Sequence, residues 1–306
     1  GRILYLMKIT ASDETLVTAT FGTRMTLRTT DGTEVTARLK GKKLRPVCGD
    51  YVVAGPIKNE SEWLISAIEP RRNELTRPNS IGHKEVLAAN LDCIIVMAAP
   101  LPKPDWFIVD RYLAAAENIG CAAAIAFNKT DLKGSAISPL DEYRDCGYPV
   151  IECSAKTGHN LDCFSTTLAG VIGIIVGQSG VGKSTVINAL IQDTVRSTAT
   201  LSDNTGEGRH TTVNSALLYL PNGGAVIDSP GARDYVPSIK SIDAVICGFR
   251  EISRMSEDCR FSNCRHLREP DCAVKCAVND GTISSRRYES YKRLMVLTKD
   301  LIGKPF

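Results

Sequence analysis

Residues 177–185, reading GQSGVGKST, restrict the possible folds of this chain more than any other stretch. They fit the phosphate-binding pattern GxxxxGK[ST] and follow the apolar run 171–176. The pattern predicts a strand, a glycine-rich turn and a helix, because N–H groups of such a turn surround a phosphate and the helix N-terminus adds its positive end. About one unrelated chain of this length in a hundred would match by chance. We therefore expect an α/β nucleotide-binding domain.

Within this stretch, Lys183 is expected to reach the β- and γ-phosphates and to act in catalysis, and Ser184 to hold Mg²⁺. The nucleotide-binding residues predicted here are Gly177, Gln178, Ser179, Gly180, Val181, Gly182, Lys183, Ser184 and Thr185.

Two motifs that follow predicted strands precede this stretch. Residues 128–131, NKTD, fit the guanine-recognition pattern NKxD, and residues 154–156 match the supporting motif SAK. The Asp131 carboxylate can accept hydrogen bonds from guanine N1–H and N2, whereas adenine offers neither donor, so ATP is disfavoured. The motifs together predict GTP and GDP as ligands, bound by Asn128, Lys129, Asp131, Ser154, Ala155 and Lys156.

Segment 194–212 is long and polar, which is typical of a functional loop when it occurs inside a compact domain. In a GTPase this is switch I, whose threonine binds Mg²⁺; we expect Thr212 in this role, with Thr211 as second choice. A predicted hairpin then leads to residues 228–231, DSPG, a DxxG motif. Asp228 is expected to bind Mg²⁺ through water, and the Gly231 N–H to contact the γ-phosphate.

The order of these motifs differs from that of ordinary small GTPases, in which NKxD and SAK come last. Here both precede the phosphate-binding turn. A compact domain with neighbouring termini tolerates circular permutation, so we predict a circularly permuted GTPase domain. DxxG then lies near the point where the chain leaves this domain.

The N-terminal part alternates short β-prone runs with turn signals such as Asp31-Gly32. Five short strands in about 70 residues predict a small closed barrel, of the OB-fold type or, alternatively, SH3-like. The basic run Lys40, Lys42, Lys43 and Arg45 suits phosphate contact, and a solvated hairpin loop explains it equally well.

Near the C-terminus, three cysteines and one histidine lie within residues 259–272. Three thiolates and an imidazole are a typical ligand set of a structural zinc site, and the apolar-poor C-terminal segment gains from such a metal. We predict one Zn²⁺ bound by Cys259, Cys264, His266 and Cys272. Cys276 could replace Cys272 or be a spare thiol, and a set of reduced core cysteines is the less favoured reading.

The whole chain resembles the RsgA-type (YjeQ-type) GTPases. The features that carry the resemblance are NKTD, GQSGVGKST, GRHTT at Gly208, DSPG and the cysteine and histidine cluster. The resemblance implies an OB-fold barrel at residues 1–72, a circularly permuted GTPase domain at 73–245 and a mainly α zinc-binding domain at 246–306. It also implies GTP hydrolysis stimulated by the small ribosomal subunit during late assembly, with rRNA contact. Because Ala232 offers no side chain to orient water, we expect His210 to assist hydrolysis; a solvated loop histidine is the alternative.

Composition and charge agree with this reading. The segments 1–72, 73–245 and 246–306 have net charges of +4, −5 and +4, so the two ends are expected to contact a polyanion. The longest apolar runs are too short to span a bilayer, and the N-terminus lacks a signal-like stretch. We therefore expect a cytoplasmic monomer that binds neither membrane nor DNA, with its 11 cysteines reduced or on metal.

Two other functions would also use a phosphate-binding turn. In the first, the chain is an RNA-binding assembly protein whose nucleotide only sets its conformation, with negligible turnover, since the water-orienting glutamine of Ras-like enzymes is absent. In the second, a P-loop ATPase, Asp131 argues against adenine.

Overall fold

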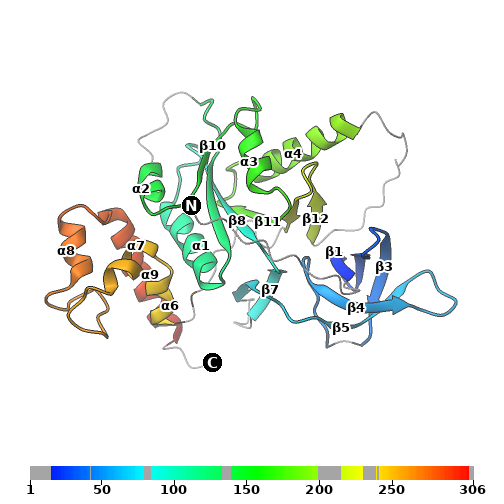
Figure 1. Ribbon diagram of the computed structural model, residues 1–306, viewed down its shortest axis with the longest axis horizontal. Helices are drawn as coiled ribbons and strands as arrows, with labels where there is room; N and C mark the ends of the chain where they lie inside the picture. Colours follow the sequence, from blue (N-terminus) through cyan, green and yellow to red (C-terminus); the bar gives the residue numbers. More distant parts are fainter. Residues whose placement is uncertain are drawn as a thin grey trace.

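The computed structural model describes residues 15–41, 43–78, 84–132, 139–198, 215–229, 239 and 241–302. Figure 1 shows a β-barrel, a central α/β domain and a helical C-terminal part on the opposite side of the central domain from the barrel. The predicted architecture is confirmed, and the domain boundaries stay predictions.

The barrel contains five strands: β1 (Thr15–Phe21), β2 (Arg24–Arg28), β3 (Glu34–Leu39), β4 (Tyr51–Pro56) and β5 (Trp63–Ile68). They pair in the order β1-β2-β3-β5-β4, and β4 returns to β1, which closes the barrel. The pair β3–β5 is parallel and the others are antiparallel. This Greek-key closure is of the OB-fold type rather than SH3-like. The inward side chains form a separate core of Val17, Met25, Leu27, Ala37, Val52 and Ile65.

A two-stranded sheet follows the barrel. It pairs β6 (Glu74–Pro78) with β7 (Lys84–Ala89). Polar residues and a terminal proline hide the strand pattern of β6, and cross-strand ion pairs such as Arg77–Glu85 at 2.6 Å stabilise the hairpin instead.

The central sheet contains five parallel strands: β8 (Cys93–Ala98), β9 (Ala122–Phe127), β10 (Val150–Glu152), β11 (Ile172–Gly177) and β13 (Ala225–Asp228). Antiparallel β12 (Ser215–Tyr219) lies beside β13. Within the described residues, four helices accompany the sheet: α1 (Trp106–Asn118), α2 (Leu140–Asp145), α3 (Leu161–Thr167) and α4 (Lys183–Thr198).

Along β8, alternate residues enter two different cores, as expected for a strand that is covered on both faces. Ile94 and Val96 pack with α1 and α2, whereas Ile95 and Met97 pack with α3 and α4. The carboxyl ends of the parallel strands therefore form one edge between two layers of helices, where ligand loops are expected.

The barrel and the central domain share one continuous sheet. β1 pairs with β12 through Ala19↔Ala216 and Thr20↔Ser215, so the sheet has eleven strands within the described residues.

The C-terminal part contains α6 (Ile242–Cys247), α7 (Arg250–Ser256), α8 (Ala273–Asn279) and α9 (Ser285–Ile302). Its core includes Phe249, Ile252 and Tyr291, and also Ala114 of α1. A Cβ at Gly248 would lie 2.6 Å from the Ala114 Cβ, so the approach of this segment to α1 requires glycine. A boundary at residue 246 would cut α6. In the described residues, no helix is both long and apolar enough to cross a bilayer.

A buried ionic cluster joins this part to α1. The Arg287 side chain is 1% exposed and donates to Asp110 Oδ1 at 2.7 Å and to both Glu251 oxygens at 2.8 and 2.9 Å. Tyr143 and Arg286 also donate to the fully buried Asp110. Burial alone would lower the pKa of Arg287, but Asp110 and Glu251 raise it well above its usual value. Charged side chains from three helices are therefore paired at this seam.

Candidate nucleotide site and metal centre

The predicted phosphate-binding stretch forms the turn between β11 and α4. Gly177 has φ +135°, and a Cβ there would lie 2.2 Å from the Met97 carbonyl oxygen. Gly182 has φ +98°, and its Cβ would lie 2.4 Å from Asn128 Nδ2. Both positions combine a backbone conformation and a close approach that other residues cannot adopt.

Lys183 Nζ lies inside this turn. It donates to the carbonyl oxygens of Gly177 at 2.6 Å and Gln178 at 2.9 Å. A cavity of about 400 Å³ opens over the turn, and its lining residues come from NKTD, the turn and the start of α4: Lys129, Ser179, Gly180, Gly182, Lys183, Ser184 and Thr185. This volume falls within the range of small-ligand pockets.

Asn128 connects the three motifs. Its Nδ2 donates to the Val181 carbonyl oxygen of the phosphate-binding turn at 2.9 Å, and its Oδ1 accepts from the Ala155 N–H of SAK at 3.0 Å. The side chain is 2% exposed, so both bonds are shielded from water. Motifs that are more than 20 residues apart in the chain thus form one site.

Lys129 adopts a left-handed backbone conformation, with φ +65°. Its Nζ donates to the carbonyl oxygens of Gly180 and Leu101, both at 2.8 Å. Non-glycine residues in this region cost energy and cluster at functional sites. The conformation carries the lysine stem along the cavity, where it can cover a base.

Asp131 is exposed and receives a hydrogen bond from Ser154 Oγ at 2.7 Å. This bond lowers the pKa of the Asp131 carboxyl, with smaller help from Lys156 and Lys129. The carboxylate is therefore ionised and oriented, as recognition of two guanine donors requires.

The loop between β8 and α1 packs against the phosphate-binding turn, and sequence reasoning missed this contact. The Asp105 N–H donates to Gln178 Oε1 at 3.2 Å, and Pro102 Cδ would lie 3.4 Å from a Cβ at Gly180. The run PLPKPD directly after a buried parallel strand was the available signal, because ligand loops follow the carboxyl ends of such strands.

The predicted Mg²⁺ ligands are only partly described. Asp228 ends β13, which runs parallel to β11, so this aspartate and Ser184 lie at the same edge of the sheet. His210, Thr211, Thr212 and Gly231 lie outside the described residues.

In the C-terminal part, one imidazole nitrogen and three sulfurs lie within 4.8 Å of one another, contributed by Cys259, Cys264, His266 and Cys272. His266 Nδ1 is 3.5 Å from Cys259 Sγ and from Cys272 Sγ, and these two sulfurs are 3.9 Å apart. Tetrahedral zinc with ordinary bond lengths requires about 3.5 Å between nitrogen and sulfur and about 3.8 Å between sulfurs. The four residues therefore fit Zn²⁺. Cys276 is exposed and is not a member of this group.

The protonation chemistry of this cluster also suits a metal. Burial raises the pKa of the Cys264 thiol to about 12, so a thiolate there needs a neighbouring cation. Burial lowers the pKa of His266, which favours the neutral imidazole that metals bind. His266 Nε2 has no hydrogen-bond partner in the described part of the chain.

Glu269 shapes the ligand loop, and sequence reasoning did not identify it. Its carboxylate accepts backbone N–H bonds from Arg265 at 3.0 Å, Leu267 at 2.8 Å and Arg268 at 3.0 Å. Burial alone would raise the pKa of Glu269, but these N–H groups and its own lower the pKa to about 2. The loop around His266 is thus fixed by a carboxylate that is not itself a ligand.

The chain is similar to known proteins of one family. Residues 68–236 match the family model described as RsgA GTPase. A "Small ribosomal subunit biogenesis GTPase RsgA" of Alcanivorax borkumensis is 38% identical over 290 residues, covering 91% of this chain and 82% of that protein. The protein of that name from Pseudomonas aeruginosa is 40% identical over 286 residues, covering 91% and 84%.

Two solved structures have the same overall fold. YjeQ from Thermotoga maritima superposes with a TM-score of 0.73 at 28% identity, covering 96% of this chain and 99% of that one. YloQ, described as a circularly permuted GTPase, gives 0.71 at 25% identity with both chains fully covered. Family model, relatives and fold agree, and the chain belongs to the RsgA GTPase family.

Proposed function

We propose that this chain binds GTP with Mg²⁺ and hydrolyses it to GDP and phosphate. The observation that carries the proposal is the Asn128 side chain, which bonds both the phosphate-binding turn and SAK. An oriented, ionised Asp131 beside it supplies guanine selectivity. A bare phosphate-binding turn would not require either group.

The roles of the chain's own residues follow from their positions. The ammonium of Lys183 would leave its carbonyl partners for the β- and γ-phosphates, while Ser184, Asp228 and Thr212 would hold Mg²⁺. When bound, the ion would neutralise charge on the phosphates. His210 would orient the attacking water, because Ala232 has no side chain able to do so.

We also propose one Zn²⁺ per chain, bound by Cys259, Cys264, His266 and Cys272. The clustering of the four ligand atoms within 4.8 Å of one another supports this set. The ion would be structural, since all four ligands come from the chain and no position remains for substrate.

The cellular role that we propose is biogenesis of the small ribosomal subunit, in which relatives bearing that name act. The basic barrel and basic C-terminal part support contact with rRNA. This role would place the chain in the cytoplasm, as a monomer acting on the subunit without membrane or DNA.

Steady-state GTP hydrolysis with and without purified small subunits tests the proposal, with Lys183→Met as the inactive control. We expect slow turnover alone and a marked increase with subunits. Turnover that stays negligible with subunits would favour the nucleotide-switched binding protein instead. Competition by ATP would contradict the role of Asp131.

A further inference from the structure

The strand β12 has a hydrogen-bonded neighbour on each edge. On one side Ala216 is level with Asp228 of β13, and on the other side it is level with Ala19 of the barrel strand β1. β12 begins three residues after Thr212, and β13 ends at Asp228. In the sequence, β12 lies between Thr212 and Asp228, the two proposed Mg²⁺ ligands. This strand is therefore attached to the barrel through β1.

One edge of β1 is divided between the barrel and the central sheet. The first residues of β1 pair with β4, through Thr15↔Val52 and Leu16↔Tyr51, and this closes the barrel. The last residues of β1 pair with β12 instead. A register shift between Val17 and Ala19 separates the two halves. Such irregularities bend a strand, which lets β1 leave the barrel and join the central sheet.

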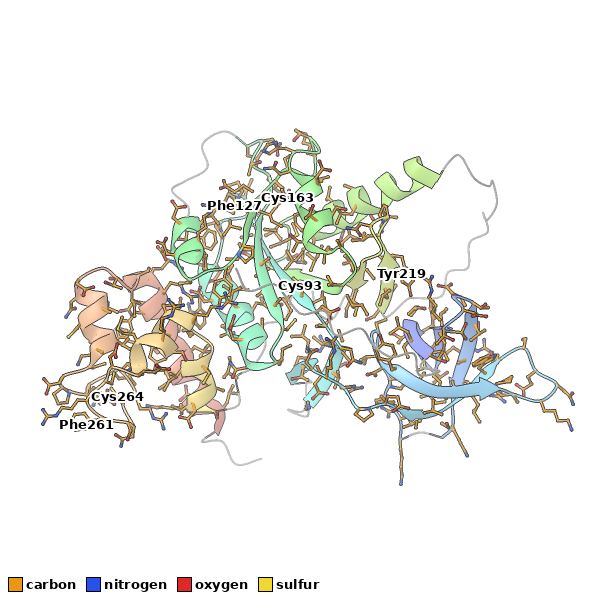
Figure 2. The ribbon with its side chains drawn as sticks, in the orientation of Figure 1. Cys93, Phe127, Cys163, Tyr219, Phe261 and Cys264 are labelled. Carbon is orange, nitrogen blue, oxygen red and sulfur yellow. The ribbon has the colours of Figure 1, made fainter. Side chains whose placement is uncertain are left out.

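Side chains reinforce the same contact. The Arg28 guanidinium lies 4.2 Å from the centre of the Tyr219 ring, at the end of β12. Figure 2 shows Tyr219 on the side of the central domain that faces the barrel. An arginine over an aromatic face attracts it electrostatically, and the contact joins β2 to β12 beyond the backbone ladder.

A second set of contacts attaches the barrel to the central domain. Asn90 Nδ2 donates to the Gly49 carbonyl oxygen at 2.8 Å, and the Ala89 N–H donates to the Cys48 carbonyl oxygen at 3.2 Å. A Cβ at Gly49 would lie 2.1 Å from the Ala89 carbonyl oxygen and 3.4 Å from Ile227 Cδ1. The barrel therefore touches β13 as well as β12.

We propose that strand β1 is a positioning element for β12, so that the barrel's grip on RNA and the nucleotide state influence each other through the β1–β12 ladder and the Arg28–Tyr219 contact. The inference rests on the proposed GTPase function. By linkage, a nucleotide that shifts β12 changes the affinity of the barrel for the subunit, and the bound subunit changes nucleotide affinity by the same factor. Neither β1 nor Arg28 needs to touch the nucleotide.

Hydrogen exchange on the 306-residue chain tests whether β1 and β12 respond together to the nucleotide. We compare the GDP complex with the complex of a non-hydrolysable GTP analogue, following amides of residues 15–21, 215–219 and 51–68. We expect β1 and β12 to change protection together, while β4 and β5 stay constant. A nucleotide-dependent change in β12 with none in β1 would overturn the proposal.

Mutation tests the thermodynamic part. Small-subunit affinity is measured in GDP and in the GTP analogue for Arg28→Gln, Tyr219→Leu, the double variant, and the control Arg38→Gln on β3. Each single variant is expected to reduce the ratio of the two affinities by about two- to fivefold, the range typical of an exposed cation–π pair. The double variant should do no more, because both changes remove the same contact.

The control separates charge from coupling. Arg38→Gln removes a barrel charge that pairs with Glu60, so it should weaken subunit binding equally with both nucleotides and leave the ratio unchanged. Variants at Arg28 that behave like this control would refute the coupling. Absence of GTP binding or hydrolysis in the unaltered chain would instead refute the proposed function, so the two failures are distinguishable.

Discussion

Replacing Arg287 by methionine should strongly destabilise the junction between the C-terminal part and α1. The change removes three charge-assisted hydrogen bonds, one to Asp110 and two to Glu251, from a site with 1% exposure. Each such bond contributes about 1.5–3 kcal/mol. Methionine recovers part of this by packing on the Phe249 ring, which lies 4.7 Å from the guanidinium. We expect a net loss of about 3–5 kcal/mol, as for other buried ion pairs that lose one partner.

Tryptophan fluorescence during urea unfolding measures this loss. The chain has two tryptophans, so Trp63→Phe leaves Trp106 as the reporter. Trp106 lies 5.9 Å from Tyr143, whose hydroxyl donates to Asp110, so the probe is next to the cluster. All variants are made in this background.

Two further variants make the test decisive. Arg144→Met also removes an arginine that pairs with two carboxylates, but its side chain is 41% exposed, so the cost should stay below about 1 kcal/mol. Adding Glu251→Gln to Arg287→Met removes the carboxylate charge that the single variant leaves without its arginine. This double variant should regain about 1–3 kcal/mol of stability. If Arg287→Met costs no more than Arg144→Met, the ionic cluster does not stabilise this junction and our reasoning is wrong.

Three further predictions concern the proposed sites. Asp131→Asn should weaken GTP binding at least tenfold and favour xanthosine triphosphate, which has an acceptor in place of the guanine amine. Competition binding with both nucleotides checks this prediction, and unchanged GTP affinity would remove Asp131 from the site. Elemental analysis should find one Zn²⁺ per chain, with loss of zinc in Cys272→Ser and retention in Cys276→Ser; the reverse pattern would show that Cys276 is the fourth ligand. His210→Ala should keep GTP binding but lose about 10²–10⁴-fold of the subunit-stimulated rate, and a normal rate would exclude its catalytic role.

Periodic and motif-bearing elements were the predictable part of the fold. The strand β8 is apolar throughout and could be assigned from sequence, as could α1, with its N-cap at Asp105. The hairpin strand β6 could not, because Pro78 and its charged neighbours read as a connector. Local pattern carries no information about cross-strand partners, so it gave no sign that Ala19 pairs with Ala216.

The candidate site divides in the same way. Residue types at fixed spacing predicted Asn128, Asp131 and Lys183 as site residues, because each chemistry requires those groups. The sequence pattern could not show that Lys129 donates a hydrogen bond to the Leu101 carbonyl oxygen, because this contact depends on the conformation of the loop after β8. Glu269 was missed for a related reason, because its function is to bind backbone N–H groups of neighbours, which any acidic residue in a turn could do.

The pairing of β1 with β12 also affects how the chain is made. About 195 residues separate Thr20 from Ser215, so β1 leaves the ribosome about 10–40 s before its partner is synthesised. During that interval β4 can close only the first half of the β1 edge, and the second half presents unpaired N–H and C=O groups. The nascent barrel is therefore a template for wrong strand pairing until the last third of the chain is made. Slow folding of the complete sheet, and dependence on chaperones at high expression, are the expected consequences.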